Sequence, residues 1–411
     1  MSILIAILGL AFLVLIHEAG HFFTARAVGM RPRRFYVGFP PALAKTTRNG
    51  IEYGIGSIPL GGYVKIPGMH RPAPTDADSY FGPALFHDAS LVGPVERMKR
   101  LLALGDFEQA RSVELPRLRA AIEEAEMPAG AARAAQRGLS EIDDALGPDA
   151  YWRQRTWKRV AVIAAGPLTN AVFAFVILAV VYMLGIPYDA SRRVEIVSPT
   201  SPAASAGLRP GDLIVAVDHV PTSTFKQVST QIRGSNGKPV VVSVIRRGRY
   251  LDLPARKTVK ENGYYVYGFR PSGLRYKHYS PVAAFGQSGS DLGGFTKDVG
   301  SVLGRLVQGS GRKDVSSPVG IVDASSQAVK ASFRDYLTIV AAISMSLALL
   351  NLLPLLPLDG GHIAFSIFEG IRGRSVGRAV YERVSVVGIA LVLLLFFVGL
   401  SNDLSRHIHG G

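Results

Sequence analysis

The chain of 411 residues contains no cysteine. This absence excludes a disulfide-stabilised scaffold, a thiolate metal site and a cysteine nucleophile. Charged residues are also scarce, because Asp, Glu, Lys and Arg make up 19% of the sequence whereas 48% of it is hydrophobic. Such a composition is too apolar for an ordinary soluble protein, so we expect the apolar residues to be concentrated in membrane spans.

Basic residues outnumber acidic ones by 46 to 31, which gives a formal net charge of +15. An excess of this kind is typical of nucleic-acid-binding proteins, and also of membrane proteins whose Lys and Arg cluster beside their spans. The basic residues of this chain gather at the ends of its apolar stretches. The sequence therefore indicates a protein in contact with membrane lipid and without a nucleic-acid partner.

Four stretches approach the roughly 20 apolar residues that cross a hydrocarbon core of about 30 Å. They cover residues 3–27, 160–186, 336–353 and 384–400. The first lacks a basic N-terminal region and contains His17, Glu18 and His21, so we interpret it as a retained span and not as a cleaved signal peptide. The sequence predicts a polytopic α-helical membrane protein with four transmembrane helices.

The orientation of the spans follows from the positions of Lys and Arg, which are enriched in cytoplasmic loops. Arginine clusters follow the first span, precede the second, and lie between the third and the fourth. We expect these loops in the cytoplasm. Both termini and the long segment after the second span are then extracytoplasmic.

The cytoplasmic loop between the first two spans has two unlike parts. Residues 31–91 begin with strand-like runs rich in Gly, aromatic and β-branched residues, which predict a β-loop beside the membrane. Residues 92–159 turn to Ala, Arg, Glu and Leu at helical spacing, which predicts a soluble helical insert. The simplest interpretation of this insert is a solvated helical hairpin without chemistry.

The extracytoplasmic segment between the second and third spans also divides in two. In residues 193–275, a small helix ends at Gly207 and the turn Pro210-Gly211-Asp212 leads into an apolar strand, an order that resembles a PDZ domain. PDZ domains bind peptide C-termini by adding them to a sheet edge. A β-rich spacer that binds nothing is the alternative. Residues 276–335 are Gly/Ser-rich and weakly amphipathic, and indicate a linker on the outer membrane face.

The clearest chemical motif is His17-Glu18-Ala19-Gly20-His21, which has the pattern H-E-x-x-H. On a helix its two histidines lie on one face and can bind one metal ion, while Glu18 stands beside them to take a proton from water. Ionisable groups inside a membrane span are costly unless they pair or serve a function. His17 precedes Arg26 by nine residues, which places it roughly 14 Å inside the cytoplasmic boundary.

A catalytic zinc usually has three protein ligands, so a third is needed. The region of residues 336–362, which contains the third span and the loop after it, offers Asp359 at the cytoplasmic end of that span. His362 is the rival candidate. Asp359 could instead only cap the next helix.

These motifs together resemble the site-2 protease family, and within it the bacterial regulator of sigma-E proteases. The likeness rests on H-E-x-x-H within residues 1–30, the Asp-Gly pair at Asp359, Gly166-Pro167-Leu168-Thr169-Asn170 in the second span, residues 37–39 and 58–65 of the β-loop, and residues 402–406. The resemblance implies zinc held by His17, His21 and Asp359, with Glu18 as general base. It also implies substrate contacts from Asn170, Asn351, Gly61 and Gly62.

The resemblance implies an intramembrane zinc metalloendopeptidase in the bacterial cytoplasmic (inner) membrane. Its expected partners are transmembrane substrates, either anti-sigma-factor-like regulators of a stress response or remnant signal peptides, cut in regulated intramembrane proteolysis. A non-catalytic PDZ membrane scaffold is the alternative, and a metal-ion transporter is a third. Two departures stand out: that group often has two tandem PDZ domains where this chain has room for one, and the helical insert has no counterpart that we can name.

Overall fold

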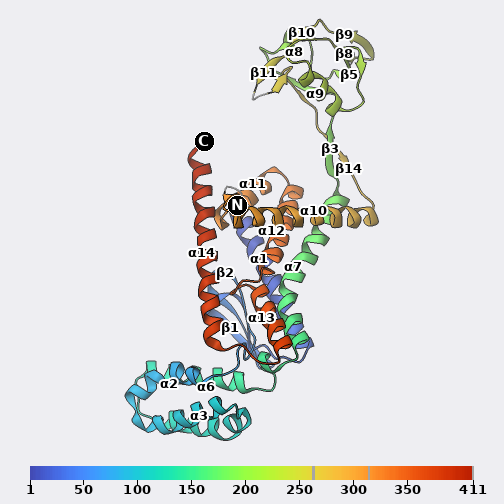
Figure 1. The fold of residues 1–411 in the computed structure, drawn as a ribbon. Helices are drawn as coiled ribbons and strands as arrows, with labels where there is room; N and C mark the ends of the chain where they lie inside the picture. The colour runs from blue at the N-terminus through green and yellow to red at the C-terminus, as the bar shows by residue number, and fades with distance from the viewer. Residues whose placement is uncertain (262–263, 313–314, 410–411) are drawn as a thin grey trace. The chain divides into compact units, whose positions relative to one another are not determined.

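The computed structural model describes residues 1–261, 264–312 and 315–409. Residues 262–263, which fall in the predicted PDZ-like region, lie outside the described residues. The chain divides into two compact units (Figure 1). The first unit is Met1–Leu178 together with the chain from Gly289 onward, and the second unit is Ala179–Ser288.

Four helices of the described chain are long and apolar enough to cross a membrane, which confirms the number predicted from the sequence. They are α1 (Ser2–Ala27), α7 (Thr156–Leu184), α12 (Phe333–Asn351) and α14 (Arg378–His409). Large apolar side chains such as Phe12 and Phe397 remain exposed on their outer faces. Lipid can cover such side chains at no cost, whereas water cannot.

The β-loop is a small sheet made by two long, bent strands, β1 (Arg34–Arg48) and β2 (Ile51–Lys65). Asn49 and Gly50 join them with φ angles of 53° and 75°, the left-handed conformation that Asn-Gly favours in tight hairpins. Arg34 lies opposite both Glu52 and Lys65, so the start of β1 lies between two segments of β2. Residues 62–65 are therefore at one side of this sheet.

The helical insert forms its own apolar core. Its elements are α2 (Pro74–His87), η1 (Ala89–Leu91), α3 (Val92–Leu104), α4 (Phe107–Gln109), η2 (Ala110–Glu114), α5 (Leu115–Glu124), α6 (Ala129–Leu146) and η3 (Tyr151–Arg153). Phe81 of α2 is fully buried with Met98, Leu118 and Leu139 of the later helices. The insert thus begins at Pro74 and not at residue 92 as we expected, because α2 contributes a whole face to this core.

Three further helices belong wholly or mainly to the first unit. Where we expected a linker, the chain forms α10 (Pro281–Val307) and α11 (Pro318–Ala331). Buried Asp403 of α14 accepts hydrogen bonds from the backbone and hydroxyl of Ser317 and from the Gly320 amide, which holds the start of α11 against α14. After α12, the loop of residues 352–358 leads into α13 (Asp359–Arg372).

The second unit is a small β-rich body with a core of its own. A four-stranded sheet has the order β6 (Val220–Pro221), β5 (Leu213–Val217), β8 (Val242–Arg246), β9 (Arg249–Asp252), and α9 (Phe225–Gly234) packs near it. Asp212 in the predicted turn is buried and bonds the guanidinium of Arg246, 2.7 Å away. Burial in the core raises the pKa of Tyr267 to about 12. The PDZ identity of this unit stays a prediction.

The strands of the second unit are short. They are β3 (Ile186–Ala190), β4 (Val194–Val197), β5 (Leu213–Val217), β6 (Val220–Pro221), β7 (Pro239–Val240), β8 (Val242–Arg246), β9 (Arg249–Asp252), β10 (Arg256–Lys257), β11 (Val259–Glu261), β12 (Tyr264–Val266), β13 (Phe269–Pro271) and β14 (Leu274–Lys277), with helix α8 (Pro202–Ser205) after β4. The first and last of them, β3 and β14, pair antiparallel with Ala190 opposite Leu274. The other strands of the unit thus lie, in the chain, between the two strands of one antiparallel ribbon.

Candidate metal centre

Helix α1 places His17 and His21 on the same face, one turn apart. Their Nε2 atoms are 3.2 Å from each other, and both residues are buried. This spacing is what four residues of an α-helix give when both rings point to one side. The geometry of helix α1 alone therefore brings two of the three candidate ligands together.

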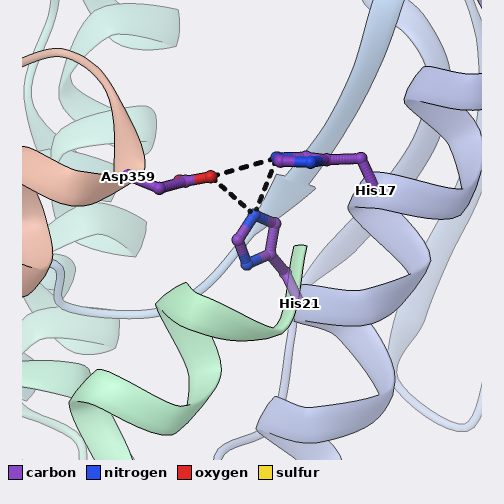
Figure 2. Close-up of side chains that lie close together, drawn as sticks. All are labelled: His17, His21 and Asp359. Carbon is purple, nitrogen blue, oxygen red and sulfur yellow. Dashed lines mark hydrogen bonds and ion pairs between the residues drawn. The ribbon is translucent and has the colours of Figure 1, made fainter. Parts of the chain in front are cut away.

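Asp359 completes the group from a distant part of the chain. It is the first residue of α13, and its Oδ2 atom lies 3.0 Å from His17 Nε2 and 3.4 Å from His21 Nε2. Figure 2 shows the three side chains pointing toward one another. The two glycines after Asp359 have no room for a side chain, because a Cβ on either would lie within 2.6 Å of backbone atoms of the preceding loop. This close packing of residues 352–361 fixes where Asp359 emerges.

Neighbours of the two histidines orient their rings. His21 Nδ1 lies 2.8 Å from the carbonyl oxygen of Val162, so Nδ1 carries the proton and Nε2 presents a lone pair. The amide of buried Asn170 lies 3.4 Å from His17 Nδ1, and its Oδ1 atom has no partner. The oxygen and nitrogen of an amide are assigned from such contacts. If the amide is rotated by 180°, its Oδ1 accepts a hydrogen bond from the protonated Nδ1 of His17. The Nε2 atom of His17 is then unprotonated and, like that of His21, can bind a metal ion.

The donor atoms suit a zinc ion in kind and in spacing. Two imidazole nitrogens and one carboxylate oxygen are ordinary zinc ligands, and ligands about 2.0–2.1 Å from a tetrahedral zinc lie about 3.3–3.4 Å from one another. The three observed separations are 3.0, 3.2 and 3.4 Å. The Asp359 Oδ2 atom is buried and makes no hydrogen bond of acceptable geometry, although both rings lie within 3.4 Å. A cation held between the three atoms would satisfy it.

Glu18 stands beside this group without belonging to it. Its side chain lines the same cavity as the histidines and contacts the end of β2, where a Cβ on Gly62 would lie 2.5 Å from Glu18 Cγ. Val64 of the same strand lines this cavity as well. The carboxylate is thus held between the metal-binding group and strand β2.

The cavity at this site has a volume of about 440 Å³. Its lining includes Val14, Phe39, Asn170, Asn351 and His362 in addition to Glu18 and the three ligand candidates. Gly61 and Gly62 belong to the strand segment beside it, and Gly61 adopts a φ of +117° that side chains rarely tolerate. The structure thus places the proposed ligands, Glu18, Asn170 and Asn351 around one cavity, with Gly61 and Gly62 in the strand that contacts Glu18.

His362, the rival third ligand, has a different partner. Its Nδ1 atom lies 2.5 Å from the hydroxyl oxygen of Tyr381, and it is not among the three residues whose ligand atoms converge. Burial, with a smaller contribution from His70, lowers the pKa of His362 to about 4. His362 is thus neutral near pH 7 and lies in the wall of the cavity.

Sequence reasoning did not assign a role to Gly166, although it belongs to the quoted motif. A Cβ at this position would lie 2.3 Å from His21 Nε2 and 2.8 Å from His17 Nε2. The absent side chain lets α7 pass directly beside the metal-binding group. Glycine next to Pro167 within an apolar span was the available signal, because glycine inside a helix is otherwise unfavourable.

We expect Gly166→Ala to weaken zinc binding by about 10- to 100-fold, the range that changes around metal ligands usually cause. The added methyl group displaces both ring nitrogens from their present positions. The measurement is a zinc titration against a competing chelator. Gly293→Ala, in a helix where a Cβ meets no atom within 4 Å, is the matched control. Equal zinc affinity in both variants would show that the site adapts to the methyl group.

The chain is similar to known proteins along almost its whole length. A model of peptidase family M50 matches residues 5–395. A relative from Agrobacterium fabrum is 30% identical over 98% of this chain and 95% of its own length. The zinc metalloprotease RasP of Shouchella clausii is 28% identical over 99% of each chain, and the zinc metalloprotease Rip1 of Mycobacterium tuberculosis is 29% identical over 97% of this chain and 94% of its own.

Proposed function

Because the chain belongs to peptidase family M50, the site-2 protease family of zinc metalloproteases, we propose that it cuts peptide bonds inside the transmembrane segments of membrane proteins. The chain is a zinc metalloendopeptidase and a membrane protein. The proposal rests chiefly on one observation: the ligand atoms of His17, His21 and Asp359 converge to within 3.4 Å, and two of them come from a helix apolar enough to span the membrane.

In this proposal His17, His21 and Asp359 hold the zinc, and Glu18 is the general base. When bound, zinc supplies a Lewis acid that polarises the scissile carbonyl and makes water more acidic. Glu18 takes a proton from the attacking water and delivers it to the leaving amine nitrogen. Its position beside the ligands, and not among them, leaves its carboxylate free for both transfers.

The substrate must present an extended strand, because a helical transmembrane segment keeps its carbonyls hydrogen-bonded internally. We propose that residues 61–65 of β2 pair with this strand through their backbone, with Gly61 and Gly62 giving it room. Glu18 contacts the same segment, so a strand bound there passes the proposed base. Asn170 and Asn351, which line the cavity, are the proposed side-chain contacts. Residues with low helix propensity in the substrate favour cleavage by easing its unwinding.

The test of the proposed function is cleavage of a single-span membrane protein by the purified chain in lipid vesicles. We expect cleavage within the span, loss of cleavage on chelation, and recovery when zinc is added back. Anti-sigma-factor-like regulators and remnant signal peptides are the two proposed substrate classes, and one of each belongs in the assay. No cleavage of either by the zinc-loaded protein would contradict the proposal.

The proposed location is the bacterial cytoplasmic membrane with both termini outside the cytoplasm. We expect a cysteine placed at Ser140 to be protected from an impermeant thiol reagent in spheroplasts, and a cysteine at Ser223 to be labelled, because arginine clusters flank the first of these loops. Both serines are exposed in the structure, and the chain has no cysteine of its own. The reverse labelling pattern would overturn the orientation and the side from which the site opens.

We propose that the second unit acts as a PDZ-like gate for substrates and takes no part in the chemistry. Under the proposed orientation it is extracytoplasmic, whereas His17 lies toward the cytoplasmic end of a core about 30 Å thick. Such a unit can exclude bulky outer domains or bind the C-termini of trimmed substrates.

Removing residues 191–273 and joining Ala190 to Leu274 through Asn-Gly tests this gate, because those two residues already face each other across the β3–β14 ribbon. We expect the shortened enzyme to cut a substrate with a bulky outer domain as readily as one with a short outer domain, while the intact enzyme prefers the short one. Unchanged discrimination would reject gating. Loss of all activity in a zinc-loaded variant would show that the second unit takes part in catalysis.

A further inference from the structure

A network of partly buried ion pairs joins the helical insert to the β-loop. Lys65, the last residue of β2, lies 2.7 Å from a carboxylate oxygen of Glu141 and 2.9 Å from one of Asp144, both on α6. Arg33, just before β1, lies 2.6 Å from the other Asp144 oxygen and 2.9 Å from Asp149. Asp144 is 9% exposed and is shared by both cations. This network joins the insert to the two strands that pair beside the catalytic cavity.

The charges lie where apolar packing is incomplete. A cavity of about 300 Å³ separates the end of β2 from α2 and α6, and Lys65 and Glu141 are both in its wall. The position of this strand end relative to the insert therefore depends strongly on the ion pairs that cross the gap. Burial lowers the pKa of Lys65, but its two carboxylate partners more than offset this and raise the pKa above its ordinary value. Lys65 is thus charged at neutral pH.

The end of β2 lies between the catalytic cavity and the insert. Successive side chains of a β-strand point to opposite faces. Val64 and Ile66 line the catalytic cavity and also border the gap beside the insert, and a Cβ on Gly62 of the same segment would lie 2.5 Å from Glu18 Cγ. Lys65 between them points to the insert. A displacement of Lys65 is thus a displacement of the segment that contacts the proposed general base.

We propose that the helical insert positions the catalytic strand, residues 62–65, and that Lys65 and Asp144 are the positioning residues that transmit its position. This inference rests on the proposed function, in which the same segment pairs with the substrate. Without the ion pair the strand end is free to shift into the gap beside it. The scissile bond and Glu18 then lose alignment, while the remainder of the transmembrane substrate still binds.

The variant that tests the inference is Lys65→Met, which keeps the length of the side chain and removes its charge. Asp144 keeps Arg33 as a partner, and Glu141 is partly solvent-exposed, so no carboxylate is left buried without a counter-charge. We expect kcat to fall about tenfold, because small misalignments of reacting groups cost one to two orders of magnitude. KM and zinc content should remain within about twofold of the wild-type values, and Lys65→Arg should restore most of kcat.

A readout independent of activity is hydrogen exchange at the amides of residues 62–65, which we expect to become faster in Lys65→Met. Asp144→Asn should give the same two changes. The double variant should be no worse than the more affected single variant, as is typical of residues that act through one contact. Lys45→Met is the control for loss of a lysine charge from the same sheet, because the ion pair of exposed Lys45 is with Glu52 of β2 and not with the insert.

Three results would overturn the inference: an unchanged kcat in Lys65→Met, unchanged exchange of the strand amides, or a fall in kcat that only follows loss of zinc or of folded protein. Where Lys65→Met does not fold, Glu141→Gln, at the more exposed partner, should produce a smaller change in the same direction, and no change there rejects the proposal. Failure of the proposed function is distinct, because wild-type protein would then not cut the substrate at all.

Discussion

Replacing Glu18 by glutamine is expected to lower kcat by on the order of 10²–10⁴-fold, the range that a positioned general acid–base group contributes. The amide has nearly the same shape as the carboxylate but cannot take a proton from water. Because Glu18 lies beside the three ligand candidates and not among them, the variant should still bind one zinc ion. The measurements are single-turnover cleavage of a membrane substrate and zinc content on the same preparation.

Glu96→Gln is the matched control, since Glu96 is an exposed residue of the insert paired with Lys99. It should cut at the wild-type rate. Near-normal cleavage by Glu18→Gln would contradict the assignment of the base, and loss of zinc from it would make Glu18 a ligand. If the variant binds substrates without cutting them, it also provides a means of isolating natural substrates from membranes.

Replacing Asp359 by alanine is expected to remove zinc from the protein and activity with it, which is the second large effect. The change takes away one of three donor atoms and leaves two histidines of one helix, too few for a stable catalytic zinc site. Zinc content after dialysis against a weak chelator measures the loss. His17→Ala and His21→Ala should behave in the same way.

His362→Ala is the informative comparison, because it changes a histidine in the wall of the same cavity, three residues further along α13. We expect it to keep its zinc, since the Nδ1 atom of His362 bonds Tyr381 and the residue is not in the converging group. Zinc retained by Asp359→Ala and lost by His362→Ala would show that the third ligand has been assigned to the wrong residue.

The local parts of the site were predictable from the sequence, because short-range geometry determines them. The spacing of His17 and His21 on a helix requires that their rings share a face, whatever the rest of the chain does. Apolar length alone predicted the four long helices. Asp359 could be proposed only from its place at the end of a span and by resemblance, since its approach to α1 depends on how the loop of residues 352–358 folds.

The parts that depend on tertiary packing were not predictable. Lys65 and Asp144 are 79 positions apart, and nothing in either local pattern indicates that they meet. The residues of helix α2 were assigned to the β-loop region. The helix starts with Pro74 and polar residues, and its apolar face is recognised only from the packing of Phe81 in the insert core. The role of Gly166 was not predictable either, because the side chains that lie against it, His17 and His21, belong to another helix.

The ribbon of β3 and β14 has a consequence for how this protein can change over evolutionary time. Its two strands bring the two ends of residues 191–273, the β-rich part of the second unit, to neighbouring points, as Ala190 and Leu274 show. Paired residues of an antiparallel ladder are only about 5 Å apart, so a hairpin turn, one folded module or several in series can occupy the same place. Gain, loss or exchange of such modules requires no change in the length or order of the membrane helices. Substrate preference can then diverge between related enzymes while the zinc site stays the same.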